Sequence, residues 1–207
     1  MPVNYDPAVW FYDPLSRFIF GRALINAQLY FLKYIKINSN IIIVGGGTGW
    51  ILEEISSKIP TGLKITYVET SEKMIIRSKK RFIANNEVVF INQPIEVING
   101  LSPFDIVITP FLFDNFKDEI ADKLFYHLHK LQKPGGLWLF SDFQPGKSLW
   151  QKLLLKSMLL FFGRFCGVEA TKLPEMSQKF TSNSYLVIDQ QNFYRNFIIS
   201  IIYSKTI

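Results

Sequence analysis

The sequence predicts an α/β fold, in which helices cover both faces of a mostly parallel β-sheet whose last strand is antiparallel. Short apolar runs alternate with helical segments through the middle of the chain, as in sheets with right-handed helical crossovers. The final segment, 192–204, has no room for a crossover helix, so its last strand should return antiparallel. With 207 residues, 48% of them hydrophobic and 19% charged, residues 1–207 should form a single domain.

The predicted elements follow one another in a regular order. Apolar residues at helical spacing predict a first helix over 23–34. Beyond it, strands are expected near 41–45, 64–69, 88–92, 104–109 and 136–142, and helices near 50–59, 72–84 and 117–131. The sequence Pro134-Gly135-Gly136 should end the last of these helices before its strand begins.

A glycine-rich turn follows the first predicted strand. The segment Ile41-Ile-Ile-Val-Gly-Gly-Gly-Thr-Gly-Trp50 predicts a buried strand, a tight turn and the start of a helix. Its spacing is G-x-G-x-G, whereas the dinucleotide fingerprint needs a glycine where Trp50 stands and a P-loop needs a Gly-Lys-Ser/Thr sequence. The turn therefore brings bare backbone close to a ligand, and the spacing disfavours a pyrophosphate.

An acidic residue ends the second predicted strand. The run Leu63-Lys-Ile-Thr-Tyr-Val68 leads directly to Glu69. Open α/β sheets bind ligands at the carboxyl ends of their strands, and an acid there can accept hydrogen bonds from both hydroxyls of a ribose. Glu69 is therefore the candidate ribose ligand.

Four motifs in this order resemble those of the class I S-adenosylmethionine-dependent methyltransferases. They are VGGGTG (44–49), VETSEKMIIRSKKR (68–81), FDIVITPF (104–111) and LQKPGGLWLFSDF (131–143). The resemblance implies a Rossmann-like three-layer sandwich with a mostly parallel seven-stranded sheet. It also implies an enzyme whose cofactor is S-adenosylmethionine.

The same resemblance implies where the cofactor lies. Its methionine half would contact the glycine turn, and Glu69 would hold the ribose. Thr70 and Met74 would flank the adenine, whose amino group Gln93 could bond. Backbone after the fourth predicted strand would lie beside the sulfonium. The implied cofactor residues are Gly45, Gly46, Gly47, Gly49, Glu69, Thr70, Met74, Gln93, Thr109 and Pro110.

Two departures from the family pattern favour a different interpretation. Many members carry an acid two residues before the first glycine, where this chain has Ile43, and the usual Asp after the third strand is replaced within 92–96. Altered motifs can accompany lost turnover, so a non-catalytic protein that keeps the pocket is an alternative. An open acceptor cavity beside the sulfonium would distinguish an enzyme from such a protein.

The N-terminal segment, residues 1–22, lies outside the predicted cofactor core. It is aromatic, is interrupted by prolines and contains Tyr5-Asp, which resembles the start of the ubiquinone and menaquinone C-methyltransferases. By that resemblance, Tyr12 and its neighbours would cap the cofactor pocket as a lid.

A helical insertion is predicted over 146–181, after the fifth strand. Its apolar helix, 149–163, has three interpretations that the sequence leaves open. It could cover the sheet, it could line an apolar substrate pocket, or it could make a shallow contact with a membrane through Lys152, Lys156 and Arg164.

Methyl transfer requires little dedicated machinery, because the cofactor carries the reactive group and the protein mainly aligns donor and acceptor. A base is needed only if the acceptor arrives protonated. Asp142, at the end of the fifth strand, and Tyr12, in the lid, are the catalytic candidates. Asp142 could instead cap backbone amides, and Asp114 is better interpreted as an N-cap to the helix near 117.

The remaining reactive residue types predict no metal site and no disulfide. His127 and His129 lie two apart on one predicted helix and have no Cys, Asp or Glu at ligand spacing. Cys166 is the only cysteine and suits a small buried apolar position. One cysteine and a start without a signal-like segment predict a cytoplasmic protein.

The net charge of +6 permits attraction to phosphate or to an anionic membrane surface. A nucleic-acid methyltransferase is an alternative, although Thr109-Pro-Phe111 stands where an Asn/Asp-Pro-Pro-Tyr/Phe motif would follow the fourth strand. We therefore predict a small, apolar or aromatic acceptor, such as a quinol, a phenol or a lipid, with peripheral membrane contact as a further expectation. The oligomeric state is not predicted.

Overall fold

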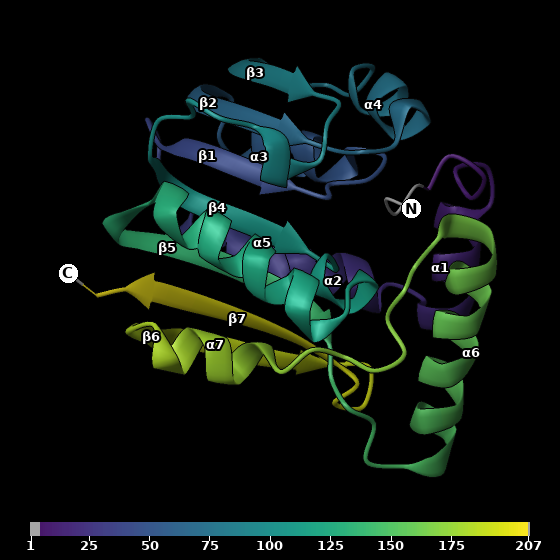
Figure 1. Ribbon diagram of the computed structural model, residues 1–207. Coiled ribbons are helices and arrows are strands. Elements are labelled where there is room, and N and C mark those ends of the chain that lie inside the picture. The colour runs from purple at the N-terminus through teal and green to yellow at the C-terminus, as the bar shows by residue number, and fades with distance from the viewer. Residues whose placement is uncertain (1–4, 207) are drawn as a thin grey trace.

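The computed structural model describes residues 5–206 and contains one seven-stranded sheet between layers of helices (Figure 1). The strands are β1 (Asn40–Val44), β2 (Thr61–Val68), β3 (Asn85–Ile91), β4 (Phe104–Pro110), β5 (Gln132–Phe143), β6 (Tyr185–Phe193) and β7 (Ile198–Lys205). The helices are α1 (Tyr12–Phe20), α2 (Ala23–Phe31), α3 (Trp50–Lys58), α4 (Glu72–Ser78), α5 (Asp118–Leu131), α6 (Leu149–Cys166) and α7 (Met176–Ser182). Short 3-10 helices are η1 (Leu32–Tyr34), η2 (Ile95–Val97) and η3 (Phe113–Asn115).

The strand order, β3-β2-β1-β4-β5-β7-β6, confirms the predicted sheet. Strands β1 to β5 pair in parallel, and β7 runs antiparallel to both β5 and β6. The direction of winding reverses between β1 and β4, so their carboxyl ends leave a crevice between the connections that depart on either side. Crevices of this kind are where open α/β sheets bind ligands.

Strand β1 shows how the sequence produces the two helical layers. Neighbouring side chains of a strand point to opposite faces. Ile41 and Ile43 pack with residues of α2, α3 and α4, whereas Ile42 and Val44 pack with residues of α5 and α7. All four side chains are at most 4% exposed. The continuous apolar run therefore belongs to a strand that is buried on both faces.

Two predicted boundaries were wrong. The helix expected over 72–84 ends at Ser78, because the next bonds, from the Lys80 amide to the Arg77 carbonyl and from the Arg81 amide to the Ser78 carbonyl, form a tighter turn. Strand β5 begins at Gln132 and includes Pro134, with a shift of register against β4. Helix α5 therefore passes into β5 without a separate loop.

Helices α1 and α6 lie together beyond the carboxyl ends of the parallel strands (Figure 1). The rings of Phe11 and Phe161 are 5.9 Å apart, and those of Tyr12 and Phe162 are 6.0 Å apart. The Gln151 side chain accepts the Ser148 amide at the start of α6, and Gly167, with φ 71°, follows its last residue. Among residues 5–206, no helix is long and apolar enough to span a bilayer.

Candidate functional site

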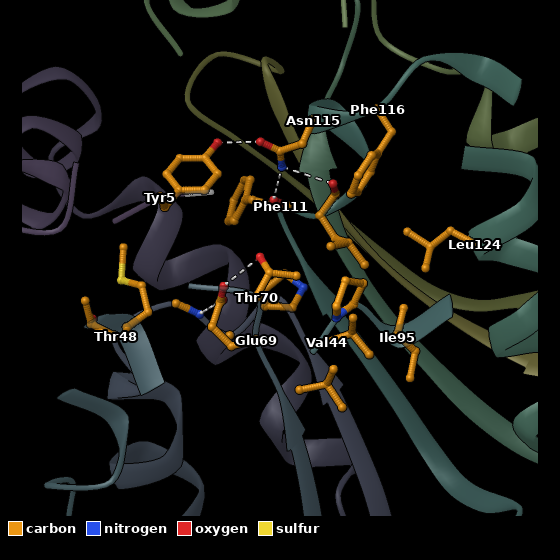
Figure 2. A pocket seen from close by; sticks show the side chains of 18 of the residues that line it. Tyr5, Val44, Thr48, Glu69, Thr70, Ile95, Phe111, Asn115, Phe116 and Leu124 are labelled. Carbon is orange, nitrogen blue, oxygen red and sulfur yellow. Dashed lines mark hydrogen bonds between the residues drawn. The ribbon is translucent and has the colours of Figure 1, made fainter. Parts of the chain in front are cut away.

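A cavity of about 330 Å³ opens at the carboxyl edge of the sheet, beside the ends of β1, β2 and β4. Ordinary small-molecule sites begin at about this volume. Figure 2 shows that its lining comes from distant parts of the chain, including Tyr5, Glu69, Phe111 and Leu124. The cavity therefore occupies the crevice that the sheet topology creates.

The glycine turn between β1 and α3 forms one wall of this cavity. Gly45, Gly47 and Gly49 have φ values of 72°, 63° and 76°, which side chains strongly disfavour. A Cβ at Gly46 would lie 2.5 Å from the Tyr67 ring, and a Cβ at Gly49 would lie 2.5 Å from the Cβ of Ser78. A Cβ at Gly47 would meet no atom within 4 Å. Gly46 and Gly49 thus permit close packing, whereas Gly47 leaves space for a ligand.

Glu69 is buried in the wall next to the glycine turn. One carboxylate oxygen, Oε2, accepts the Gly47 amide at 3.0 Å, and the other, Oε1, accepts the Ser71 amide at 3.0 Å. Burial raises the pKa of this carboxyl, and the hydrogen bonds from the backbone oppose that shift. The glycine turn and the acid are therefore held together as one polar unit.

The segment after β3 completes the polar side of the cavity. Asn92 donates from Nδ2 to the carbonyl oxygens of Glu69 and Thr70, at 2.9 Å and 3.0 Å. Gln93 and Met74 both line the cavity. Asn92 therefore stabilises the end of β2. It lies in the segment where the family pattern has an Asp.

Of the ten predicted cofactor residues, eight line the cavity, and Gly49 and Thr109 do not. Gly49 packs against α4, as described above. The Thr109 hydroxyl oxygen accepts the indole N–H of Trp138 at 2.8 Å and is fully buried, while its neighbour Pro110 reaches the cavity. Strand β4 therefore presents Pro110 and Phe111 to the ligand space.

A second, smaller cavity of about 50 Å³ adjoins the first. The two cavities share four lining residues, which are Tyr5, Tyr12, Phe111 and Asn115. The rest of the second lining is almost entirely apolar and comes mainly from α1 and α6, with Leu155, Met158, Leu159 and Phe162 on the side of α6. Asp114 is the one acid among the described residues of this lining.

Two carboxyl groups lie near the second cavity, and only Asp114 lines it. Asp142 is buried outside both cavities, and its two oxygens accept the amides of Phe113 and Phe143 at 3.1 Å and 2.8 Å. Burial raises the pKa of Asp142 to about 7. Burial and then the charge of Asp142 raise the pKa of Asp114 well above its usual value. The pKa values of both carboxyls are therefore raised, and that of Asp142 lies close to neutral pH.

The interpretation of Asp114 as an N-cap was wrong. Lys117 precedes α5, and no side chain caps that helix. Asp114 instead lies in η3, whose backbone is held by Asp142, and Asn115 donates to its Oδ1 at 2.9 Å. The amide-capping role that the sequence offered for Asp142 is the one its hydrogen bonds display.

Tyr12 and Tyr5 stand between the two cavities. Burial raises the pKa of both hydroxyls, so each is a hydrogen-bond donor rather than a base at neutral pH. The Tyr5 hydroxyl donates to Oδ1 of Asn115, and the Asn115 amide donates to the carbonyl oxygens of Phe111 and Leu112 (Figure 2). This chain of contacts ties the N-terminal segment to the end of β4. The resemblance at Tyr5-Asp indicated this segment as a lid, whereas no sequence motif identified Asn115.

Further bonds fasten the N-terminal segment over the large cavity. Thr48 donates from its hydroxyl to Asp13 at 3.1 Å, which joins α1 to the glycine turn. The Ser71 hydroxyl donates to Asp6 at 2.5 Å, and Arg77 donates to the Val9 carbonyl at 2.8 Å. The segment is therefore attached both to the turn and to α4.

The histidines and the cysteine take no part in either cavity. His129 bonds the Tyr185 hydroxyl at 3.1 Å and stacks on Phe125. Cys166 is 3% exposed, and burial raises its pKa to about 11, so it is a thiol at neutral pH. Within residues 5–206, no three His, Cys, Asp or Glu side chains are grouped so that they could hold a metal ion.

Known proteins share both sequence and fold with this chain. Residues 41–136 match a family model described as a methyltransferase domain. Over 104 residues the chain is 33% identical to malonyl-[acyl-carrier protein] O-methyltransferase 2 of Ilyobacter polytropus. That match covers 50% of this chain and 39% of the relative, so the chain matches well under half of the relative's length.

Two solved structures illustrate the fold. Magnesium protoporphyrin IX methyltransferase of Synechocystis PCC 6803, with bound SAH, has a TM-score of 0.67 at 16% identity, with 89% of this chain and 83% of that chain covered. The N-methyltransferase NodS of Bradyrhizobium japonicum WM9, with S-adenosyl-l-homocysteine, has a TM-score of 0.70 at 13% identity, with 95% and 94% covered. At these identities the likeness establishes the shared architecture.

Proposed function

We propose that the chain is a class I S-adenosylmethionine-dependent methyltransferase, as its similarity to a methyltransferase domain and to a methyltransferase relative supports, and that it methylates a small, mainly apolar acceptor such as a quinol, a phenol or a lipid. The observation that carries this proposal is a pair of adjoining cavities, of which only the larger contains the glycine turn and Glu69. The larger cavity suits the cofactor because it combines these polar groups with apolar walls, and the small cavity behind Tyr12 suits the acceptor. An open second cavity favours an enzyme over a non-catalytic protein, which would have that space filled.

The residues of the large cavity fit the chemical groups of S-adenosylmethionine. The space in front of Gly47 accepts a chain that approaches the backbone closely, because a Cβ there would point into it. Glu69 can turn its free lone pairs to the ribose hydroxyls while it keeps its amide bonds. Thr70, Met74 and Gln93 also line this cavity and would contact the adenine.

S-Adenosylmethionine supplies a methyl group on a positively charged sulfur, and the protein must align that group with the acceptor and exclude water. Phe111, Tyr5 and Tyr12 stand at the shared wall and shape the passage between the cavities. Their rings exclude water, and the Tyr12 hydroxyl can donate a hydrogen bond to an acceptor oxygen, whereas the Tyr5 hydroxyl already donates to Asn115. These residues therefore position the acceptor for an in-line transfer.

One acid is placed to meet a hydroxyl acceptor. S-Adenosylmethionine, when bound, would supply the methyl group, and the acceptor oxygen would release its proton as it takes that group. Asp114 lines the small cavity, whereas the amides of Phe113 and Phe143 hold Asp142 outside both cavities. Asp114 faces the cavity, so it is the member of the pair that contacts the acceptor.

Calorimetric titration with S-adenosylhomocysteine tests the cofactor assignment. We expect binding by the wild type and a loss of roughly 100-fold in Glu69→Ala, because about two charge-assisted hydrogen bonds of roughly 1.5 kcal/mol each disappear. Glu72→Ala, which changes an exposed acid at the start of α4, is the matched control and should bind normally. Equal affinity in all three folded proteins would end the assignment. Screening of quinols and phenols for S-adenosylhomocysteine release would then identify the acceptor.

A further inference from the structure

The outer face of α6 exposes large apolar side chains. Leu149, Leu153 and Leu160 are 80%, 65% and 66% exposed. Their separations of four and seven residues place them on one side of the helix. An ordinary surface helix presents polar side chains in such positions. This side of α6 therefore has the composition of a contact surface.

Basic residues accompany the exposed leucines. The segment 144–167 contains Lys147, Lys152, Lys156 and Arg164 and has no Asp or Glu. All four basic side chains are exposed. In the structure these charges have no acidic neighbour on their own helix, so the face is both apolar and positive.

Helix α1 extends the same surface. Phe18 is 89% exposed, and it borders a shallow apolar groove with Phe11, Pro14, Leu15 and Phe161. Arg17 is also exposed. Figure 1 shows α1 and α6 running side by side beyond the edge of the sheet. We call the exposed side chains of these two helices the docking face.

We infer that the docking face binds the surface of an anionic lipid bilayer. Exposed leucine and phenylalanine side chains can enter the boundary between headgroups and acyl chains, while lysine and arginine remain among the headgroup phosphates. Each basic residue near such a surface adds to the attraction. The chemistry of the face therefore matches both parts of a bilayer surface at once.

Charge complementarity separates the bilayer from other occupants. A second copy of the chain that packed through the same face would bring the basic side chains of both copies together, with no acid on 144–167 to pair with them. RNA would satisfy the charges but would leave the leucines without an apolar partner. A bilayer satisfies both groups.

The inner side of α6 connects the docking face with the small cavity. Leu155, Met158 and Phe162 line the small cavity from that side. Docking of the outer side would bring this cavity to the membrane, where an apolar acceptor is concentrated. That consequence rests on the proposed methyl transfer, whereas the docking itself does not.

Flotation with lipid vesicles tests the inference. We expect the full chain to float with vesicles of phosphatidylcholine that contain phosphatidylglycerol, and to float at least about 10-fold less with phosphatidylcholine alone, since several basic residues contribute. Leu153→Glu combined with Leu160→Glu should abolish flotation. Lys152→Glu combined with Lys156→Glu should remove the preference for the anionic vesicles.

Matched controls change similar residues elsewhere. Leu186 and Ile188 on β6 are 59% and 53% exposed, so Leu186→Glu with Ile188→Glu should float as the wild type does. Lys79→Glu with Lys80→Glu is the control for charge, because both lysines are exposed beside α4. Calorimetry with S-adenosylhomocysteine on the same samples reports the cofactor site separately.

The outcomes separate the two proposals. Flotation that is lost only in the α6 variants, with S-adenosylhomocysteine binding unchanged, supports the docking face. Wild-type protein that stays unbound, or α6 variants that float as well as the controls, would overturn it and leave the methyltransferase proposal intact. A dimer that the leucine substitutions dissociate would also overturn it, in favour of a second copy. Flotation without S-adenosylhomocysteine binding would overturn the methyltransferase proposal alone.

Discussion

The two cavities meet at Tyr12 but are built in different ways. The large cavity is formed by backbone amides, a buried acid and glycines that follow the strands directly. The small cavity is lined mainly by side chains of α1 and α6, two helices that lie beyond the end of the sheet. This difference suits two kinds of ligand. A rigid backbone frame can bind an unchanging cofactor, whereas the side chains of separate helices can be substituted to select a particular acceptor.

The largest expected effect comes from filling the small cavity. Leu159→Trp would occupy the space beside α6 and displace the acceptor, and a displacement of about 1 Å can cost roughly 100-fold in rate. We therefore expect the release of S-adenosylhomocysteine to fall at least about 100-fold with an acceptor that the wild type turns over. Calorimetric affinity for S-adenosylhomocysteine should not change.

The neighbouring residue supplies the control for that change. Leu160 is 66% exposed on the outer side of α6, so Leu160→Trp adds the same bulk away from the cavity. With a water-soluble acceptor, this variant should keep the wild-type rate. If both variants lost activity equally, the small cavity would have no special relation to the acceptor.

The glycine turn offers a test that separates packing from binding. In Gly49→Ala the new Cβ would lie 2.5 Å from the Ser78 Cβ, at a φ of 76°. Strain and overpacking together should lower the free energy of unfolding by about 2–5 kcal/mol. Gly47→Ala has the strain alone and should cost about 1–2 kcal/mol.

For S-adenosylhomocysteine affinity the order should be reversed, with the larger loss in Gly47→Ala. The Cβ of Gly47→Ala would enter the ligand space, so S-adenosylhomocysteine should bind at least about 10-fold more weakly to the folded variant. Urea denaturation and calorimetry on both variants measure the two quantities. A Gly47→Ala protein that bound as the wild type does would contradict the assigned direction of approach.

The last expected effect concerns the pH dependence that the buried acids produce. A carboxyl group whose pKa is raised on folding binds a proton more tightly in the folded state, so stability falls as pH rises through the window between the unfolded and folded pKa values. For Asp142 that window runs from about 4 to about 7, with a limit of about 1.4 kcal/mol per pH unit for one such group. The protein should therefore be more stable at the acidic end of this range.

Asp114→Asn should reduce that dependence on pH. The variant removes one of the two raised carboxyls and the repulsion between them, and its amide oxygen can still accept from Asn115. Urea denaturation between about pH 5 and about pH 8 should show a shallower slope than in the wild type. Identical slopes would mean that the Asp114 carboxyl does not contribute to the pH dependence of stability.

The frame of the large cavity could be predicted because its determinants are local in sequence. The strand, the glycine turn and Glu69 lie within one βαβ unit, and eight of the ten predicted residues line the cavity. Gly49 and Thr109 do not line it, because their positions serve helix packing and the Trp138 indole. Local pattern identifies a turn but does not say which way each residue points.

The acceptor side could not be predicted because its contacts join distant parts of the chain. Tyr5 and Asn115 are 110 residues apart and meet only when α1 closes over the end of β4. The end of β5 indicated Asp142 as a catalytic candidate, yet the amides of Phe113 and Phe143 occupy its oxygens. Asp114, which the sequence assigned to capping, instead faces the cavity.

A crystal structure with S-adenosylhomocysteine tests the central claim most directly, because it locates the ribose and the sulfur in one measurement. We predict that the ribose hydroxyls bond Glu69 and that the sulfur faces the shared wall at Tyr12 and Phe111. A ligand that left Glu69 without contact, or whose sulfur pointed away from the small cavity, would contradict the account.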